Sequence, residues 1–195
     1  MKKYEFTGET KQVGLLGNIT LKRIRATMEF GIVKIGDLGG WIEKEENLSH
    51  EGKAWVWGNA EVWGNAKVWG NAEVCGNAKV CGNAEVYGNA EVWGNAEVWG
   101  DAKVWGDAKV CGNAKVFSIS HVLVIGPIGS RNDFTTFFRD KDSEITVKCG
   151  CFLGKIDKFL EKVSETHGDS KYAIVYRTAV EIAKQQIDLS EEKQV

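Results

Sequence analysis

The segment Gly58–Phe117 reads GNAEVW GNAKVW GNAEVC GNAKVC GNAEVY GNAEVW GNAEVW GDAKVW GDAKVC GNAKVF. It consists of ten uninterrupted copies of one six-residue unit, Gly-(Asn/Asp)-Ala-(Glu/Lys)-Val-X, where X is an aromatic residue or cysteine. A short period sustained without gaps is typical of a solenoid, in which each coil stacks on its neighbours. The repeat therefore predicts the fold of this segment and leaves open what the finished rod does.

Within each unit, successive side chains alternate between the two faces of a strand. The uniform Ala and Val positions are expected inside, because a column of charges cannot be buried without partners. The Glu/Lys and X columns are then expected outside. Gly-Asn is expected at the corners, since both residues tolerate positive φ. Asp101 and Asp107 replace asparagine at two corners, where an equivalent corner role is favoured over metal ligation.

The pattern over residues 52–123 resembles the left-handed parallel β-helix of hexapeptide-repeat proteins. The resemblance implies a left-handed path and a triangular coil of three six-residue sides. An entering copy, Gly52–Trp57, and a degenerate leaving copy, Ser118–Leu123, bring the total to about four coils. The resemblance also implies a homotrimer with parallel axes, which would bury part of the apolar surface.

At that spacing, two of the three charged columns alternate in sign from coil to coil. The columns are Glu61, Lys79, Glu97, Lys115; then Lys67, Glu85, Lys103, His121; and, only partly alternating, Trp55, Glu73, Glu91, Lys109. Exposed ion pairs are worth about 0 to 1 kcal/mol each. We therefore expect these ladders to favour the correct register more than to supply stability.

Six tryptophans in the X columns are candidates for ligand stacking or for a subunit interface: Trp57, Trp63, Trp69, Trp93, Trp99 and Trp105. On two sides of the coil, tryptophan alternates with a smaller residue, which leaves about 9.6 Å between rings at a strand spacing of ~4.8 Å. A base, a partner's side chain or neighbouring Lys and Glu stems could fill that space. Cross-strand packing or subunit contact is the competing interpretation, and apolar side chains on all three sides exceed what monomers usually expose.

Residues 1–51 are predicted to form an N-terminal β cap over the open end of the solenoid. Lys3–Thr7 and Ile19–Arg25 have the pattern of a hairpin, and Gly36–Ile42 is a glycine-permitted lead into the first coil. The sequence of residues 39–49, Gly-Gly-Trp-Ile-Glu-x-Glu-x-Asn-Leu-Ser, followed by Gly-Asn-Ala repeats, resembles uncharacterised β-helix proteins encoded in bacterial and prophage genomes. That resemblance implies a fold and a context, and no reaction.

Residues 124–195 are predicted to form a small α+β domain. Phe134–Phe138 and Ile145–Cys149 are expected to pair as a hairpin around the polar turn Asp140–Ser143. Two helices with a turn at His167–Asp169 are expected from apolar residues at helical spacing: Ile156, Phe159, Leu160 and Val163, then Tyr172, Val175, Tyr176, Ala179, Val180 and Ala183.

A candidate anion-binding loop lies in Gly126–Asp133. Glycine-permitted turns can aim backbone N–H groups at an anion, and a serine hydroxyl and an arginine fork would complete a phosphate or carboxylate clamp. The predicted ligand-binding residues are Ser130, Arg131, Asn132, Asp133 and Arg139. The lysine and following helix of a P-loop are missing, and a plain linker is the alternative.

The five cysteines are interpreted as free thiols in a reducing compartment. Cys75 and Cys111 are two coils apart, about 9.6 Å, which is beyond the roughly 7 Å limit for a disulfide. Cys149-Gly-Cys151 with His167 invites a zinc interpretation, but a fourth ligand is not evident. A buried pair of thiols is favoured there, ahead of a redox or nucleophilic role and then of metal, so no metal or cofactor is predicted.

Composition limits the class of protein. The net charge of −2 over 195 residues, with acids and bases interspersed, argues against a partner such as duplex nucleic acid and against a disordered acidic tail. The sequence shows no signal-peptide pattern and no run of apolar residues that could span a membrane. We therefore expect a soluble cytoplasmic protein, in the host cell cytoplasm if it is phage-encoded.

The sequence predicts a non-enzymatic oligomeric binding module that sequesters an anionic small molecule, such as a nucleotide signal of host antiviral defence. The host context comes from the prophage resemblance. A structural scaffold or spacer in a phage particle or intracellular assembly is the alternative. The resemblance to hexapeptide-repeat proteins also implies acyltransferase activity as a candidate, with a catalytic histidine at a loop extruded from the coils. This activity is less favoured, because the central repeats contain neither a histidine nor an inserted loop, and His50 and His121 lie at the ends.

Overall fold

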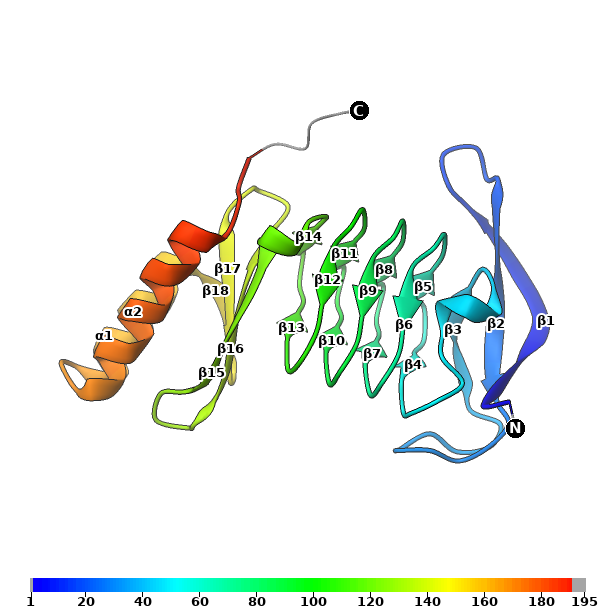
Figure 1. Cartoon of the computed structure of the whole chain (residues 1–195), viewed down its shortest axis with the longest axis horizontal. Coiled ribbons are helices and arrows are strands. Elements are labelled where there is room, and N and C mark those ends of the chain that lie inside the picture. The colour runs from blue at the N-terminus through cyan, green and yellow to red at the C-terminus, as the bar shows by residue number, and fades with distance from the viewer. Residues whose placement is uncertain (1, 191–195) are drawn as a thin grey trace.

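The computed structural model describes residues 2–190. Figure 1 shows three consecutive parts along one long axis: a β hairpin with its connections, a stack of parallel coils, and an antiparallel sheet covered by two helices. The predicted class, mainly β with a parallel β-helix of about four coils and a C-terminal α+β part, is confirmed. No helix in this range is long and apolar enough to cross a bilayer.

The coils have three faces, each a stack of two-residue parallel strands. The first face contains β5 (Glu61–Val62), β8 (Lys79–Val80), β11 (Glu97–Val98) and β14 (Lys115–Val116). The second face contains β6 (Lys67–Val68), β9 (Glu85–Val86) and β12 (Lys103–Val104). The third face contains β4 (Trp55–Val56), β7 (Glu73–Val74), β10 (Glu91–Val92) and β13 (Lys109–Val110). Glu61 lies opposite Lys79, 18 residues on, so the predicted coil length is confirmed.

The interior of the coils is the predicted one. Every repeat Ala and Val from Ala60 to Val116 is fully buried, while the X residues are mostly half-buried. At the corners, asparagine amides donate to the residue 18 positions on. Asp101 and Asp107 end two of these ladders, accepting from Asn83 and Asn89 at 3.0 Å. This supports their interpretation as equivalent corner residues.

Ion pairs join successive coils on all three faces. Lys115 meets Glu97 at 3.6 Å, Lys103 meets Glu85 at 3.4 Å, and Lys109 meets Glu91 at 3.3 Å. On the third face Glu73 lies opposite Glu91 in the ladder. Burial, and then the Glu91 carboxylate, raise the pKa of Glu73.

The last predicted coil side does not form. Ile119–His121 is a short 3₁₀ helix, η2, and the next strand begins at Val122. His121 was expected to continue an exposed charged column, and that expectation is wrong. Its side chain is buried, and its Nδ1 accepts a hydrogen bond from the Phe117 amide at 3.3 Å.

The corner glycines are expected to differ in their tolerance of a side chain. Gly88 has φ +75°, and a Cβ there would lie 2.9 Å from the Gly106 amide nitrogen; Gly58 has φ +58° with open space around it. Left-handed backbone costs an L-residue about 1–2 kcal/mol. We expect Gly58→Ala to lower the free energy of unfolding by about 1 kcal/mol and Gly88→Ala by about 2 kcal/mol, measured by urea denaturation. Equal losses would contradict the close-contact account.

The N-terminal part continues the first face. β1 (Tyr4–Val13) and β2 (Ile19–Ala26) form the predicted hairpin, longer than expected. β3 (Leu38–Ile42) pairs antiparallel with β2 and parallel with β5, so one sheet runs β1-β2-β3-β5-β8-β11-β14. After the 3₁₀ helix η1 (Glu45–Asn47), Leu48 bridges to Val68 on the second face. The first coil therefore begins at β3.

Trp55 departs from the expected outward column. Its side chain is fully buried, and its ring lies 5.4 Å from Phe30, 6.2 Å from Tyr4 and 6.4 Å from Trp57 between centroids. Trp55 does occupy a Glu/Lys position on the outside of the coil, opposite Glu73. It is buried because the N-terminal segment folds over the third face, which the repeat alone does not reveal.

The C-terminal sheet follows chain order: β15 (Val122–Ile128), β16 (Asp133–Arg139), β17 (Ile145–Cys149) and β18 (Phe152–Lys155). The helices α1 (Ile156–His167) and α2 (Lys171–Gln186) cover one face. Phe137 packs with these helices, whereas Phe138 packs with the solenoid core. The predicted hairpin and both helices are confirmed; β15 and β18 were not predicted, and Val175, expected in the buried stripe of α2, is 39% exposed.

Candidate functional site

A groove of about 470 Å³ lies on the first face of the solenoid, between two tryptophans. Trp63, Cys81 and Trp99 follow β5, β8 and β11, so they occupy the same position in three successive coils. We call this hollow the Trp63–Trp99 groove; its other lining residues are Val13, Gly14, Glu61, Lys79, Glu97 and Val98. The alternation of tryptophan with a small residue thus produces a space on this face.

The floor of the groove is an unreactive thiol. Burial, and then the nearby Glu97 carboxylate, raise the pKa of Cys81 to about 11, with Lys79 acting in the opposite direction. Since the thiolate is the nucleophilic form, Cys81 behaves as a small apolar surface. The Trp99 wall of the groove is supported by the next coil, because the Trp99 ring stacks on Phe117 with centroids 5.0 Å apart.

The charges around the groove leave one ammonium group without a counter-ion. Glu61 pairs with Lys11 of β1 at 2.6 Å, and Glu97 pairs with Lys115 at 3.6 Å. Lys79 lies between these two carboxylates in the ladder, yet it joins no ion pair in the part of the chain that the structure describes. The groove therefore has two aromatic walls, an apolar floor and an exposed cation beside it.

The rim of the groove comes from the far end of the N-terminal hairpin. Val13 ends β1, and Gly14 begins the turn to β2. Sequence reasoning missed both residues, because no local pattern connects residue 13 with residues 63–99. The only sequence signal for these residues was the predicted hairpin. Its position beside the first face depends on the continuous sheet that runs through β3.

The other two tryptophan columns are arranged differently. On the second face Tyr87 fills the space between Trp69 and Trp105: its ring stacks on theirs at centroid distances of 4.4 Å and 6.4 Å. On the third face Trp57 and Trp93 pack against the solenoid core, next to the Glu73 and Glu91 carboxylates. On the first face, by contrast, an open space lies between two tryptophans.

The predicted anion loop is the exposed turn between β15 and β16. Ser130, Arg131 and Asn132 lie in the turn, and Asp133 begins β16. The Arg131 Nη1 atom lies 4.0 Å from Cys151 Sγ. Ser130 is a neighbour of the Tyr176 hydroxyl on α2, whose pKa is raised by burial and then by Cys149. This turn thus gathers polar side chains. None of the hollows described here lies at it.

The Cys149-Gly-Cys151 segment is the turn between β17 and β18. Cys149 is half-buried and accepts a hydrogen bond from Thr135 Oγ1 at 3.3 Å. Cys151 is exposed, so the expectation of a buried pair of thiols is wrong. His167 packs on the Tyr176 ring at 5.7 Å. Within residues 2–190, no three His, Cys, Asp or Glu side chains converge as metal ligands would.

Arg139 lies at the opposite end of β16 from the Ser130–Asp133 turn. Its side chain is buried, its Nη2 donates to Ser143 Oγ at 2.6 Å, and its guanidinium lies 4.9 Å from the centre of the Phe117 ring. The structure therefore does not bring Arg139 to Arg131. These contacts instead fix the turn that joins β16 to β17.

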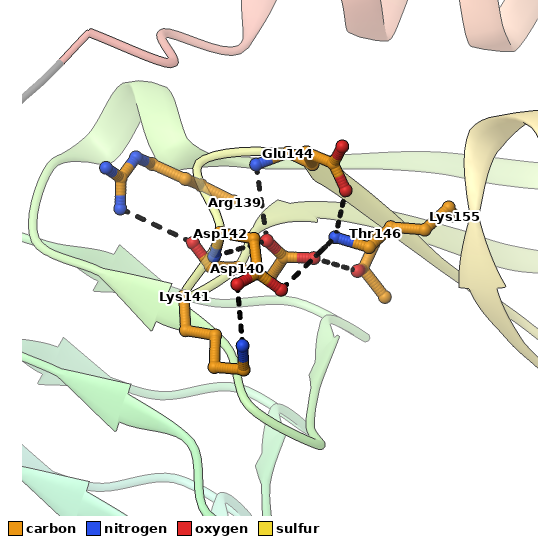
Figure 2. Close-up of polar contacts among 7 residues, drawn as sticks. All are labelled: Arg139, Asp140, Lys141, Asp142, Glu144, Thr146 and Lys155. Atoms are coloured by element: carbon orange, nitrogen blue, oxygen red, sulfur yellow. Dashed lines mark hydrogen bonds and ion pairs between the residues drawn. The ribbon is translucent and has the colours of Figure 1, made fainter.

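Asp140 organises the polar cluster shown in Figure 2. Its carboxylate accepts from the backbone amides of Asp142 at 3.0 Å and Glu144 at 3.2 Å, from Thr146 Oγ1 at 2.6 Å, and from Lys155 Nζ. Lys155 also meets Glu144 at 2.5 Å. Burial alone would raise the pKa of Asp140, but the hydrogen bonds from Lys155, Thr146 and the two amides outweigh it and hold that pKa below its ordinary value.

The cluster joins the C-terminal sheet to the last coil. Asp140 bridges to Ala114, and the Lys141 amide donates to the Asn113 carbonyl at 3.0 Å. A hollow of about 240 Å³ between Cys111, Asp140 and Lys155 is smaller than the Trp63–Trp99 groove. Because all four donors to Asp140 belong to the protein, the cluster is best explained as a structural junction.

Comparison with known proteins gives one partial similarity. Over 62 residues the chain is 34% identical to the uncharacterized acetyltransferase YdcK of Escherichia coli (strain K12). The match covers 29% of this chain and 19% of that protein, so the chain spans about a fifth of the length of this relative. No protein-family model matches the chain.

Proposed function

We propose that this protein is a non-enzymatic binding module that holds a flat aromatic anion, such as a nucleotide, in the Trp63–Trp99 groove. The observation that carries the proposal is the combination of two tryptophan walls, the neutral Cys81 floor and the unpaired Lys79 ammonium. These features match the two parts of such a ligand. The ring would contact the indoles, and the anionic group would meet the lysine.

The spacing of the walls supports a stacked ligand. Trp63 and Trp99 are two coils apart, about 9.6 Å at a strand spacing of ~4.8 Å. The gap is therefore wide enough to admit a planar ring above the Cys81 thiol, stacked on one of the two indoles. Stacking of a base on an aromatic side chain is worth about 1–3 kcal/mol, with little dependence on which base it is.

The test is a binding titration followed by tryptophan fluorescence. Two pairs of probes separate the two parts of the proposal: adenosine monophosphate against adenosine, and 8-anilinonaphthalene-1-sulfonate against the same ring system without its sulfonate. We expect the anionic member of each pair to bind about tenfold more tightly, a difference of about 1.4 kcal/mol. Lys79→Gln should abolish that preference, because it removes the cation and leaves a polar, uncharged side chain that is one atom shorter.

Trp99→Ala and Trp93→Ala form a matched pair of variants. Both replace an X-column tryptophan, but Trp93 lies on the third face, beside carboxylates and away from the groove. Trp99→Ala is expected to weaken binding at least tenfold, and Trp93→Ala to leave it unchanged. Arg131→Ala in the same titration tests the predicted anion loop. Equal losses from both tryptophan variants, or binding that does not saturate, would refute the groove.

The proposal extends to sequestration by an oligomer. A protein that binds a nucleotide without converting it lowers the free concentration of that nucleotide. The resemblance of the N-terminal pattern to prophage-encoded proteins supports a particular use, which is removal of a nucleotide signal of host antiviral defence. A homotrimer with parallel axes would cover the second face, where Trp105 and Ile119 remain exposed. Analytical ultracentrifugation checks the trimer.

A scaffold or spacer is the second candidate, and the second face favours it. The stacked Trp69, Tyr87 and Trp105 rings form a continuous apolar ladder with no gap for a ligand. Such a surface suits contact with another protein. Assembly that depends steeply on protein concentration, together with no response to either probe pair, would support this candidate over the binding module.

Acetyl transfer is the third candidate, and it rests on the partial similarity to YdcK. None of the three histidines lies on the central coils: His50 packs on Tyr4, His121 is buried at the end of the solenoid, and His167 lies on α1. Release of coenzyme A from acetyl-coenzyme A by the purified protein, in the presence of an amine or hydroxyl acceptor, would support it.

A further inference from the structure

We propose that Leu15 and Leu16, at the tip of the β1–β2 hairpin, form an apolar cover that closes over the ligand in the Trp63–Trp99 groove. This inference rests on the function proposed above and adds to it a second contact surface. It also narrows the ligand: the part of the ring system that faces solvent from between the indoles should be apolar.

The two leucines are the most exposed large apolar side chains of the described chain, at 100% and 88% of their surface. They occupy the turn from Gly14 to Gly17, which a hydrogen bond from the Gly17 amide to the Gly14 carbonyl closes at 3.1 Å. A turn with this exposure normally carries polar residues. Two adjacent leucines at such a tip indicate a surface that becomes covered in another state.

The position of the tip identifies what covers it. Val13 and Gly14, the residues directly before the leucines, line the groove together with Trp63, Cys81 and Trp99. A ligand that fills the groove would therefore lie next to the turn that carries the leucines, although their side chains do not line the groove in this structure. Figure 1 shows the β1–β2 hairpin at the N-terminal end of the solenoid, with its turn projecting past the corners of the nearest coils.

The hairpin also has a pivot from which the tip can move. The pairing of β1 with β2 is regular up to Phe6 and again from Thr10 to the turn, with an irregularity between these two residues. Gly8 lies within this irregularity; its φ is +94°, and a Cβ there would meet nothing within 4 Å. Pairing of β2 with β3 extends outward only to Lys22. Beyond that point the two hairpin strands pair with each other alone.

One ion pair connects the outer hairpin to the groove. Lys11 meets Glu61 at 2.6 Å and lies 4.6 Å from the centre of the Trp41 ring. Glu61 is itself a lining residue of the groove. The outer hairpin is thus attached at the edge of the groove through Lys11, while the leucine tip projects beyond this attachment.

The inference is tested with 8-anilinonaphthalene-1-sulfonate as the probe and four proteins: the full chain, Leu15→Ser/Leu16→Ser, Trp99→Ala, and the combination of all three changes. The leucines are exposed, so their replacement is expected to leave the fold intact, as circular dichroism would show. We expect the leucine pair to weaken binding about tenfold in the full chain and to have no further effect once Trp99 is removed. The matched control is Ile32→Ser/Ile35→Ser, which removes two other exposed apolar residues outside the groove.

The outcomes separate the two proposals. If the probe does not bind the full chain at a saturable site, both the groove and its cover are refuted. If binding depends on Trp99 but the leucine pair has no effect, the groove stands and the cover is wrong. A leucine effect that persists unchanged without Trp99, or one that the isoleucine control reproduces, also overturns the cover, because the probe would then be reporting general apolar surface.

Discussion

Replacing Trp55 by alanine is expected to lower the free energy of unfolding by about 3–5 kcal/mol, the usual cost of truncating a buried tryptophan. Its ring is fully buried and lies against Tyr4 and Phe30, both from the N-terminal segment. Removing the ring leaves a cavity between that segment and the first coil of the third face. The loss should therefore weaken the attachment of the whole cap.

Trp105→Ala is the matched control. Trp105 belongs to the same repeats but is 40% exposed and packs through one side on Tyr87. Its replacement is expected to lower the free energy of unfolding by less than about 1 kcal/mol. Urea denaturation followed by circular dichroism measures both variants without depending on tryptophan emission. A cost for Trp55→Ala that is no larger than that for Trp105→Ala would show that the cap is not anchored by this ring.

The repeat allowed most of the solenoid to be predicted, because its register is a matter of counting. Once a coil has three six-residue sides, the partner of Glu61 must be Lys79, and the structure pairs them. The Ala and Val interior follows from alternation along each strand. A short period repeated many times in this way predicts structure well, since each coil contacts only its neighbours.

Contacts between distant parts of the chain could not be predicted in the same way. Trp55 is buried by Tyr4 and Phe30, which no period relates to it. Arg139 was predicted to bind the ligand together with Arg131, but Arg131 lies in the turn before β16 and Arg139 ends that strand. In both cases tertiary packing, rather than local propensity, decides the environment of the side chain.

The candidate groove was predictable in part. The spacing of Trp63 and Trp99 around the smaller Cys81 already indicated a gap of about two strand spacings. The sequence could not indicate which of two similar columns stays open. Which column stays open depends on two tertiary contacts. Trp57 and Trp93 pack against the core on the third face, and the hairpin brings Val13 to the first face.

Replacing Asp140 by asparagine is expected to lower the free energy of unfolding by about 3 kcal/mol. The side chain of Asp140 is only 8% exposed, and its carboxylate accepts hydrogen bonds from Thr146, from Lys155 and from two backbone amides. An asparagine removes the charge and turns part of this acceptor into a donor that faces other donors. The affected turn connects the C-terminal sheet to Asn113 and Ala114 of the last coil, so the sheet should detach first.

The stability difference between the original protein and Asp140→Asn should also depend on pH. The pKa of Asp140 is lower in the folded protein than its ordinary value of 3.8. A carboxyl group of this kind stabilises the fold above its unfolded pKa, and that stabilisation is lost as the pH falls through the folded pKa. We therefore expect the full difference at pH 6 and a steadily smaller one as the pH falls below 3.8.

Asp142→Asn provides the matched control for this prediction. Asp142 lies in the same turn, but its carboxylate is 52% exposed and pairs with Lys141 at 2.6 Å and with Lys155 at 3.9 Å. Exposed pairs contribute about 0–1 kcal/mol, so this variant should stay within that range and show little dependence on pH. Denaturation curves of both variants at pH 3 to 6 decide the matter. A constant difference for Asp140→Asn across that range would mean that its carboxylate charge does not hold the junction together, and that the hydrogen-bonded shape of the turn does.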